Sequence, residues 1–145
     1  MSLFATDRVL VPTDFSAAAD RVLQDTVAEV GDRGQVHVLH VLPKLNPGEP
    51  GVMWNTIDNR TRTEHVYQEF QRRYQTMLGE SYGQVIFKVA IGDPSNQIAS
   101  YIQAQAITLV VIPSHGRKGL SHFLMGSVAE RVSRCAPCPV LIMRR

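Results

Sequence analysis

The chain has 145 residues, of which 44 % are hydrophobic and 19 % charged, and its formal net charge at pH 7 is +2. This length and composition fit one globular domain over residues 1–145 with a sizeable apolar core. So small a net charge argues against nucleic acid or an anionic membrane as a partner. No apolar run is long enough to span a bilayer, and no secretory signal opens the sequence, so we expect a cytoplasmic protein.

Strands and helices are predicted to alternate along the whole sequence. Short apolar runs predict strands at residues 8–12, 35–42, 85–91, 107–112 and 139–143. Helices are predicted from a Ser16 cap to about Val30, over about 59–79, from an Asp93 cap with Pro94 in the first turn, and from Ser127. The Pro- and Gly-rich stretch 43–51 is predicted to be a surface loop that could act as a flap. Near-continuous apolar strands between helices indicate the α/β class, with a parallel sheet covered on both faces.

The segment that follows the fourth predicted strand carries the clearest functional signal. It reads Ser114-His115-Gly116-Arg117-Lys118-Gly119 and continues, after six residues, with Gly126-Ser127-Val128-Ala129-Glu130. Ser127-x-x-Glu130 has the capping-box pattern, so we expect Ser127 to cap a helix whose first N–H groups face the loop. Glycines allow a close backbone approach, and the positive end of a helix attracts anions. The segment therefore predicts a phosphate cradle, although a plain turn followed by a helix cap would use the same residues.

Two other strand ends are expected to join this loop. In open parallel sheets, ligands bind beyond the carboxyl ends of the strands, where the strand order reverses. Pro12-Thr13-Asp14 follows the first strand, and Val41 lies at the end of the second. The sequence therefore predicts one site built from three strand ends.

These residues resemble the universal stress protein family over essentially the whole chain. The resemblance rests on the order and spacing of Val9-Leu10-Val11-Pro12-Thr13-Asp14-Phe15-Ser16, His40-Val41, Gly92-Asp93-Pro94, the Ser114–Gly119 loop, Gly126–Val132 and Ala136–Leu141. It implies a single-domain, doubly wound, Rossmann-like fold of the adenine nucleotide alpha hydrolase type, with five parallel strands in the order 3-2-1-4-5. It also implies a homodimer. The last strand is the expected interface, because an exposed edge of Val140, Leu141, Ile142 and Met143 invites pairing with a second copy; burial within one subunit is the alternative.

ATP-binding members of this family carry Gly-x-x-Gly, nine residues and then Gly-Ser or Gly-Thr. Gly116 and Gly126-Ser127 match the second half of this pattern, but Pro113 stands at the first glycine position. Proline has no N–H and a fixed φ, so it would remove a hydrogen bond to the ligand or prevent a close approach there. The resemblance implies ATP as the ligand, alone or with Mg²⁺. The alternative is a member that binds no nucleotide and acts as a dimeric interaction module.

The resemblance also implies a role for each site residue. Asp14 and the backbone of Val41 would contact the nucleoside, and Pro12 and Thr13 would shape the same wall of the site. The ribose and phosphates would be surrounded by the loop residues Pro113, Ser114, His115, Gly116, Arg117, Lys118 and Gly119. The terminal phosphates would be bound by Gly126, Ser127 and Val128. For Asp14, the N-cap of the first helix is the alternative role.

No catalytic residue is assigned from the sequence. Hydrolysis needs a group that activates water and ligands for a metal ion. His115 is the only titratable candidate base in the loop, and the sequence places no carboxylate beside it to hold Mg²⁺. We expect at most slow hydrolysis or autophosphorylation at Ser127, and we interpret the protein as a nucleotide-gated switch for an unknown protein partner.

Three other patterns have plain structural interpretations. His37 and His40 are expected to be core or strand-end residues, and Cys135 and Cys138 to be packing or turn residues. A zinc site of these cysteines with His115 and His122 lacks a recognisable ligand spacing. Gly116-Arg117-Lys118-Gly119 imitates the RNA clamp of KH domains, but the order of strands and helices is wrong for that fold.

Overall fold

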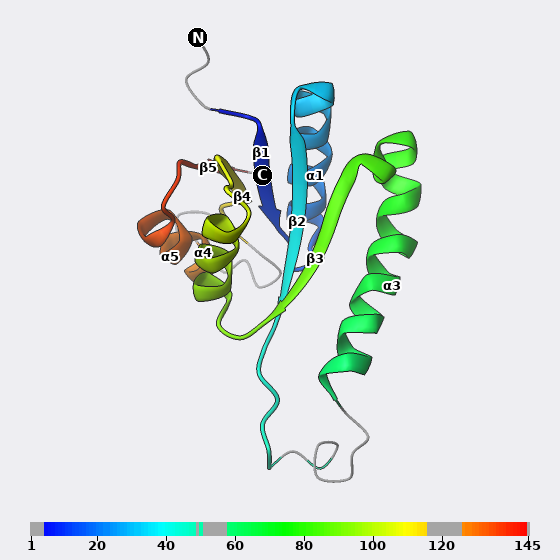
Figure 1. Cartoon of the computed structure of the whole chain (residues 1–145), viewed down its shortest axis with the longest axis vertical. Coiled ribbons are helices and arrows are strands. Elements are labelled where there is room, and N and C mark those ends of the chain that lie inside the picture. Colours follow the sequence, from blue (N-terminus) through cyan, green and yellow to red (C-terminus); the bar gives the residue numbers. More distant parts are fainter. Residues whose placement is uncertain (1–4, 49, 51–57, 116–125, 145) are drawn as a thin grey trace.

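The computed structural model describes residues 5–48, 50, 58–115 and 126–144. The helices and strands in these ranges are β1 (Arg8–Pro12), α1 (Ala17–Val30), β2 (Gln35–Leu42), α3 (Asn59–Leu78), β3 (Val85–Ile91), α4 (Pro94–Ala104), β4 (Leu109–Pro113), α5 (Ser127–Cys135) and β5 (Val140–Met143). Short 3-10 turns at Gly31–Arg33 and Gly79–Gln84 lead into β2 and β3. The five strands are parallel and lie in the order β3-β2-β1-β4-β5, which confirms the predicted fold and strand order (Figure 1).

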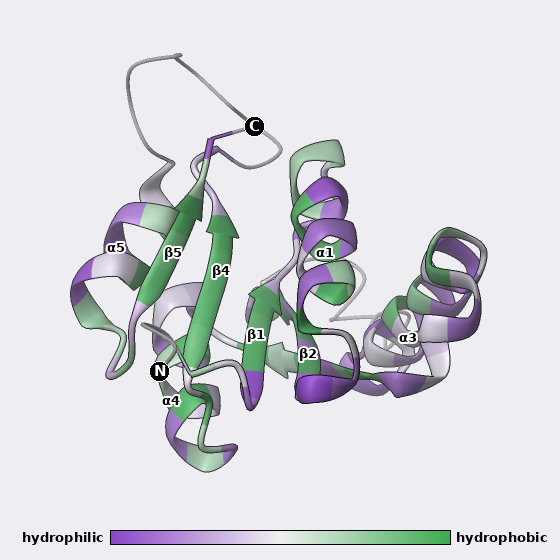
Figure 2. Ribbon diagram, turned by 90° about the horizontal axis from the view of Figure 1, so that it is seen from above, coloured by the Kyte–Doolittle hydropathy of each residue, from purple (hydrophilic) through white to green (hydrophobic). Residues whose placement is uncertain are grey.

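The sheet is covered on both faces because apolar side chains occupy successive positions of its central strands. Alternate residues of a strand point to opposite faces, so Val9 and Val11 of β1 join one core cluster while Leu10 joins the other. The first cluster contains side chains of α1 and α3, and the second contains side chains of α4 and α5. Figure 2 shows these two pairs of helices on opposite sides of the sheet.

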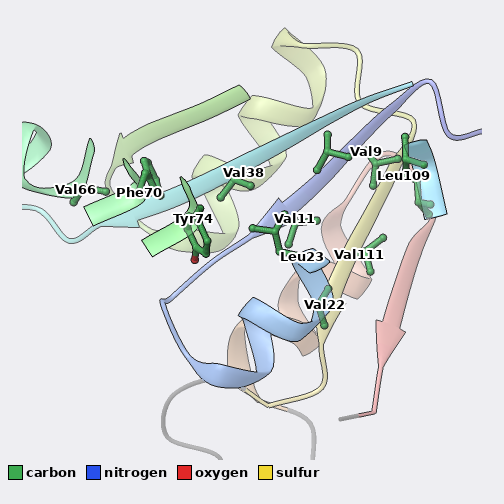
Figure 3. Close-up of a cluster of buried hydrophobic side chains, with 12 residues drawn as sticks. Val9, Val11, Val22, Leu23, Val38, Val66, Phe70, Tyr74, Leu109 and Val111 are labelled. Carbon is green, nitrogen blue, oxygen red and sulfur yellow. The ribbon is translucent and has the colours of Figure 1, made fainter. Parts of the chain in front are cut away.

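Helix α3 is attached to the sheet by a narrow stripe. Its buried residues are Val66, Phe70 and Tyr74, four residues apart, so they share one side of the helix. Figure 3 shows these three side chains against the face of the sheet that Val38 and Val11 also line. Phe70 is 1 % exposed and Tyr74 is fully buried, so the helix is docked mainly through its last three turns.

Side-chain caps start three of the helices. Ser16 accepts a hydrogen bond from the N–H of Ala19 at 3.1 Å, and Asp93 accepts one from Asn96 at 3.1 Å. Both caps confirm the prediction from sequence, and Pro94 lies in the first turn of α4 as expected. Asp58 caps α3 in the same way, by accepting from Thr61 at 2.7 Å.

The start of α5 corrects one prediction. Gly126 has the extended conformation of an N-cap, with φ −63° and ψ 154°, and Ser127 is the first helical residue. Ser127 is therefore not the cap of a capping box, and Glu130 instead lies 3.7 Å from Arg134, one turn later. The buried residues of α5 are Ala129 and Val132, whereas Val128 is exposed, as is Cys135, which we expected to be a packing or turn residue.

Smaller differences from the prediction concern the first residues of two strands. The fourth and fifth strands begin at Leu109 and Val140, one or two residues later than predicted. Thr108 therefore lies outside the fourth strand, and its side chain donates to the carbonyls of Ala5 and Arg8.

Both cysteines are free thiols. In the part of the chain that the structure describes, no helix has the length and apolar character needed to cross a membrane.

Candidate functional site

The strand order reverses between β1 and β4, and a buried hydroxyl side chain follows each of these two strands. β1 is paired with β2 on one side and with β4 on the other. Thr13, directly after β1, is 7 % exposed, and Ser114, directly after β4, is 8 % exposed. Small polar side chains at such a point can bind a ligand without filling the space it needs.

The turn after β1 is fixed by backbone and side-chain hydrogen bonds. The N–H of Thr13 donates to the carbonyl of Leu39 at 2.9 Å, and Nδ1 of His40 donates to the carbonyl of Thr13 at 2.8 Å. Asp14 Oδ1 accepts from the N–H of Ser16 at 2.9 Å. Because Ser16 caps α1, the alternative role of Asp14 as that cap is excluded.

Phe15, in the middle of this turn, has an unusual backbone conformation. Its φ is +62°, in the left-handed region that side chains other than glycine rarely adopt. A residue held there costs free energy and persists only where its surroundings fix it. The turn is therefore a place where packing imposes the shape of the backbone.

Ser114 joins the end of β4 to the start of α5. Its N–H donates to the carbonyl of Met143 in β5 at 2.9 Å, and its own carbonyl accepts from the N–H of Gly126 at 2.6 Å. The two sides of segment 116–125 are thus held together. The first turn of α5, whose N–H groups have no partner within the helix, begins beside the end of β4.

His115 extends this end of the site. Ser114 Oγ and His115 Nδ1 are 3.1 Å apart, within hydrogen-bond distance. Nε2 of His115 is buried and has no hydrogen-bond partner in the part of the chain that the structure describes. A buried polar atom without a partner is uncommon in proteins, and a ligand atom that reached this nitrogen could supply the hydrogen bond.

Pro113 is the last residue of β4 and is buried. The backbone N–H groups of Val110 and Ser114 donate to β5, and donors alternate between the two sides of a strand. The nitrogen of Pro113 therefore faces β1. Although proline has no N–H to donate, no hydrogen bond to β5 is lost. The effect of this proline falls on the β1 side of β4, where the strand order reverses.

The structure places the remaining predicted residues as follows. Pro12 ends β1, and Val41 is half-buried near the end of β2, two residues beyond Leu39, the partner of Pro12. Ser127 and Val128 lie at the start of α5, where both are exposed. Gly116, Arg117, Lys118 and Gly119 lie outside the described residues, as does His122. Residues 43–48 of the predicted flap are described, and Arg62 of α3 donates to the carbonyl of Pro43 at 2.7 Å.

Three residues that the sequence did not single out also contact the site. Tyr74 and Arg73 of α3 bond Thr13 and Phe15 of this turn. Asp20 of α1 accepts hydrogen bonds from both of them. Burial raises the pKa of Tyr74 well above its usual value, so it remains a phenol that can donate. No local pattern marks these residues, because they lie more than 50 positions from the turn or inside an ordinary helix.

Comparison with known proteins places this arrangement in a family. A family model described as the universal stress protein family matches residues 5–144. A universal stress protein of Methanocaldococcus jannaschii, MJ0531, is 28 % identical over 95 % of this chain and 82 % of its own. The solved structure of a second protein of that organism, MJ0577, is 26 % identical with a TM-score of 0.77 and 96 % coverage of both chains. UspA of Lactobacillus plantarum is 23 % identical with the same TM-score, and the match covers 97 % of this chain and 99 % of that one.

Two more distant neighbours were solved with nucleotides. One is a universal stress protein in complex with cAMP, with a TM-score of 0.69 and 16 % identity, and the match covers 96 % of this chain and 97 % of that one. The other is a family protein of Arabidopsis thaliana with AMP bound, with a TM-score of 0.63 and 18 % identity, covering 96 % and 92 % of the two chains. At this identity the likeness shows a shared fold.

Proposed function

The chain belongs to the universal stress protein family, and from this premise we propose that it binds an adenine nucleotide, ATP in the first instance, at the carboxyl ends of β1, β2 and β4. The proposal is carried by one observation, the hydrogen bond of 2.6 Å between Gly126 and Ser114. It sets the positive end of α5 beside the switch point of the sheet, where a phosphate chain could bond the N–H groups that have no partner within the helix.

The described residues divide the site into a nucleoside end and a phosphate end. Thr13, Asp14 and the backbone of Val41 form the nucleoside end, where a carboxylate can accept hydrogen bonds from ribose hydroxyls or an adenine amine but would repel phosphate. Ser114, His115 and the first turn of α5 form the phosphate end. The unsatisfied Nε2 of His115 supports this assignment, because a ligand oxygen would supply the missing partner.

The relatives solved with cAMP and AMP support a nucleotide as the class of ligand. ATP itself, with or without Mg²⁺, is the finer part of the proposal. It rests on the match of Gly116 and Gly126-Ser127 to the pattern of the ATP-binding members. Within the described residues, no group of three or more His, Cys, Asp or Glu side chains could hold a metal ion, so Mg²⁺ would arrive with the phosphates it coordinates.

We assign the bound state a signalling role in the cytoplasm. Nucleotide would join the strand ends to α5 and, through Arg62 and Pro43, reach the loop that precedes α3. β5 is an edge strand whose Leu141 is 40 % exposed. Pairing of this edge with a second copy would cover it and make the protein a homodimer.

The direct test compares ATP with AMP by isothermal titration calorimetry. Ser127 is exposed at the first position of α5, beside the phosphate end. Ser127→Ala should weaken ATP binding by about 3- to 10-fold, the loss of roughly one hydrogen bond to a charged group. It should leave AMP binding unchanged, because AMP lacks the β- and γ-phosphates that we place at Ser127.

Ser133→Ala is the matched control. Ser133 lies in the same helix, and its hydroxyl bonds only the carbonyl of Glu130 among the described contacts, so this variant should bind both nucleotides like the wild type. A wild-type protein that binds neither nucleotide at millimolar concentration would defeat the proposal. It would favour the alternative in which Pro113 has disabled the site and the protein is an interaction module.

A further inference from the structure

The turn after β1 is enclosed by a ring of hydrogen bonds that begins and ends on Phe15. The N–H of Phe15 donates to Thr13 Oγ1 at 3.0 Å. Thr13 Oγ1 lies 3.1 Å from the hydroxyl of Tyr74, which donates to Asp20 Oδ1 at 2.9 Å. Arg73 closes the ring by donating from Nε to Asp20 Oδ2 at 2.8 Å and from Nη2 to the carbonyl of Phe15 at 2.7 Å. We call these five residues the Phe15 circuit.

The direction of every bond in the Phe15 circuit is determined. A carboxylate oxygen can only accept, so the single proton of Tyr74 is committed to Asp20. Thr13 must then donate its hydroxyl proton to the oxygen of Tyr74, which leaves its own lone pair for the N–H of Phe15. Donation therefore runs one way from Phe15 through Thr13 and Tyr74 to Asp20, while Arg73 donates to both Asp20 and the carbonyl of Phe15. Hydrogen bonds in such a chain polarise and strengthen one another in a buried setting.

The side chain of Phe15 is confined as tightly as its backbone. Its ring centroid lies 4.8 Å from that of His40 and 5.5 Å from that of Phe70, and the guanidinium carbon of Arg73 is 5.8 Å from it. The same Arg73 therefore holds Phe15 by its carbonyl and by its ring. Arg73 is only 30 % exposed at its side chain, and its partner Asp20 is 16 % exposed, so solvent screens this pair much less than a surface pair.

The Phe15 circuit stabilises an unfavourable backbone conformation, the φ of +62° at Phe15. A left-handed phenylalanine is unfavourable by itself and needs surroundings that over-determine it. The circuit bonds both the N–H and the carbonyl of Phe15, and the aromatic cage fixes its ring. Thr13 and Asp14 directly precede Phe15 in the chain. The backbone conformation of Phe15 therefore helps to determine how these two residues of the proposed nucleoside end are oriented.

We infer that Arg73 and Tyr74 of α3 are positioning residues of the nucleotide site, which hold the Thr13–Ser16 turn in the conformation that presents Asp14 to the nucleoside. The inference rests on the proposed function and adds to it the element that shapes the site. Because coupling is reciprocal, nucleotide bound at Asp14 stabilises the docked position of α3 to the same extent.

The test uses Tyr74→Phe, Arg73→Met and the double variant, with Arg72→Met as the matched control. Tyr74→Phe removes one hydroxyl and keeps the ring. Arg72 is adjacent on α3, its side chain is 72 % exposed, and it bonds Glu69 at 2.7 Å. Glu69 also lies 3.5 Å from Arg73, so the loss of Arg72 measures the cost of removing an arginine beside Arg73 while Asp20 and Phe15 keep their bonds to it. Arg73→Lys serves as a second probe if Arg73→Met fails to fold, because lysine keeps the charge but lacks the planar fork whose Nε and Nη2 reach Asp20 and Phe15 separately.

Each single variant should weaken ATP binding by about 3- to 10-fold in calorimetry, which corresponds to roughly one hydrogen bond. The double variant should have about the same ATP affinity as the single variant that binds ATP less tightly, because both residues act through one circuit and their effects do not add. Arg72→Met should bind like the wild type. In hydrogen exchange, the amide of Phe15 should exchange faster in the Tyr74 and Arg73 variants, and saturating ATP should slow exchange in the last turns of α3 of the wild-type protein.

Two outcomes overturn the inference. Folded Tyr74→Phe and Arg73→Met proteins with wild-type ATP affinity would show that the turn keeps its shape without the circuit. Additive losses, with no change at the Phe15 amide, would show general destabilisation and no positioning. If the wild type itself binds no adenine nucleotide, the proposed function fails and the role toward nucleotide falls with it, and exchange at the Phe15 amide still shows whether the circuit holds the turn.

Discussion

His37 is a buried titratable residue in the first half of β2, away from the carboxyl end of that strand. We expect it to make the stability of the protein depend on pH. It is 2 % exposed in β2, where Nδ1 lies 2.7 Å from the hydroxyl of Tyr101 in α4. Burial lowers the pKa of His37, and the positive charges of Arg8 and Lys88 lower it further. Burial also raises the pKa of Tyr101 to about 12, so the phenol keeps its proton. Nε2 of His37 has no partner among the described residues, so a proton there would be uncompensated.

The sign of the pH effect follows from this lowered pKa. The unfolded chain takes up a proton at the ordinary histidine pKa of about 6.5, while the folded protein takes it up only at lower pH. The free energy of unfolding should therefore be fully retained above about pH 6.5 and should fall as the pH drops through the lowered pKa. Urea unfolding between about pH 7.5 and about pH 5.5 should show this fall in the wild type, and a smaller fall in His37→Leu. Equal slopes in the two proteins would contradict the assignment.

Among the elements, α3 depends on the fewest contacts for its length. Its buried stripe has three residues, with Phe70 at the centre. The ring centroid of Phe70 lies 6.2 Å from that of Tyr74 and 5.0 Å from that of Phe87, and it also has the rings of Phe15 and Tyr67 as neighbours. The first two turns of α3 are mostly exposed and bear charge pairs such as Arg60 with Glu64 at 3.3 Å. Exposed pairs of this kind contribute little to stability, so docking of the helix rests on its stripe.

Phe70→Ala should lower the free energy of unfolding by about 3 to 5 kcal/mol, as expected for a buried aromatic side chain replaced by alanine. Tyr67→Ala, one turn earlier, is the control. Tyr67 is 40 % exposed, so its loss should cost about 1 kcal/mol or less. Chemical denaturation monitored by circular dichroism measures both values. Similar losses for the two variants would show that the stripe does not anchor the helix.

The elements also show which features the sequence could predict. β1, α1, β2 and β3 begin and end at the predicted residues, because apolar runs, a serine cap and flanking glycines leave one consistent interpretation. The predicted cap of α5 was wrong. The Ser127-x-x-Glu130 spacing is satisfied equally well when Gly126 caps the helix and Ser127 lies inside it, and only the backbone conformation separates the two. The Phe15 circuit could not be predicted, since it joins Asp20 to residues 53 and 54 positions away, Arg73 and Tyr74.

On the scale of the whole molecule, the sheet has two edges with different character. β3 forms one edge and β5 the other. Figure 1 shows α3 beside the β3 edge, while β5 ends near the C-terminus. In β5 the exposed Leu141 lies among three half-buried residues, Val140, Ile142 and Met143. An apolar side chain in the middle of a short edge strand is the feature expected at a site of pairing between copies.

Leu141→Lys should convert the proposed dimer to a monomer, because a charge on each side of the two-fold axis would face its own copy. Sedimentation velocity at micromolar concentration measures the change, and circular dichroism verifies that the variant is folded. Tyr67→Lys, at an equally exposed large hydrophobic residue on α3, should leave the assembly unchanged. A Leu141→Lys protein that is still dimeric would place the interface elsewhere.

Native mass spectrometry of the freshly purified protein, before and after addition of Mg-ATP, shows whether the strand ends and the start of α5 bind an adenine nucleotide. We expect a dimer that carries one nucleotide on each subunit, and the same loading per subunit in the Leu141→Lys monomer. A protein that stays empty at millimolar ATP, in either assembly, would contradict it.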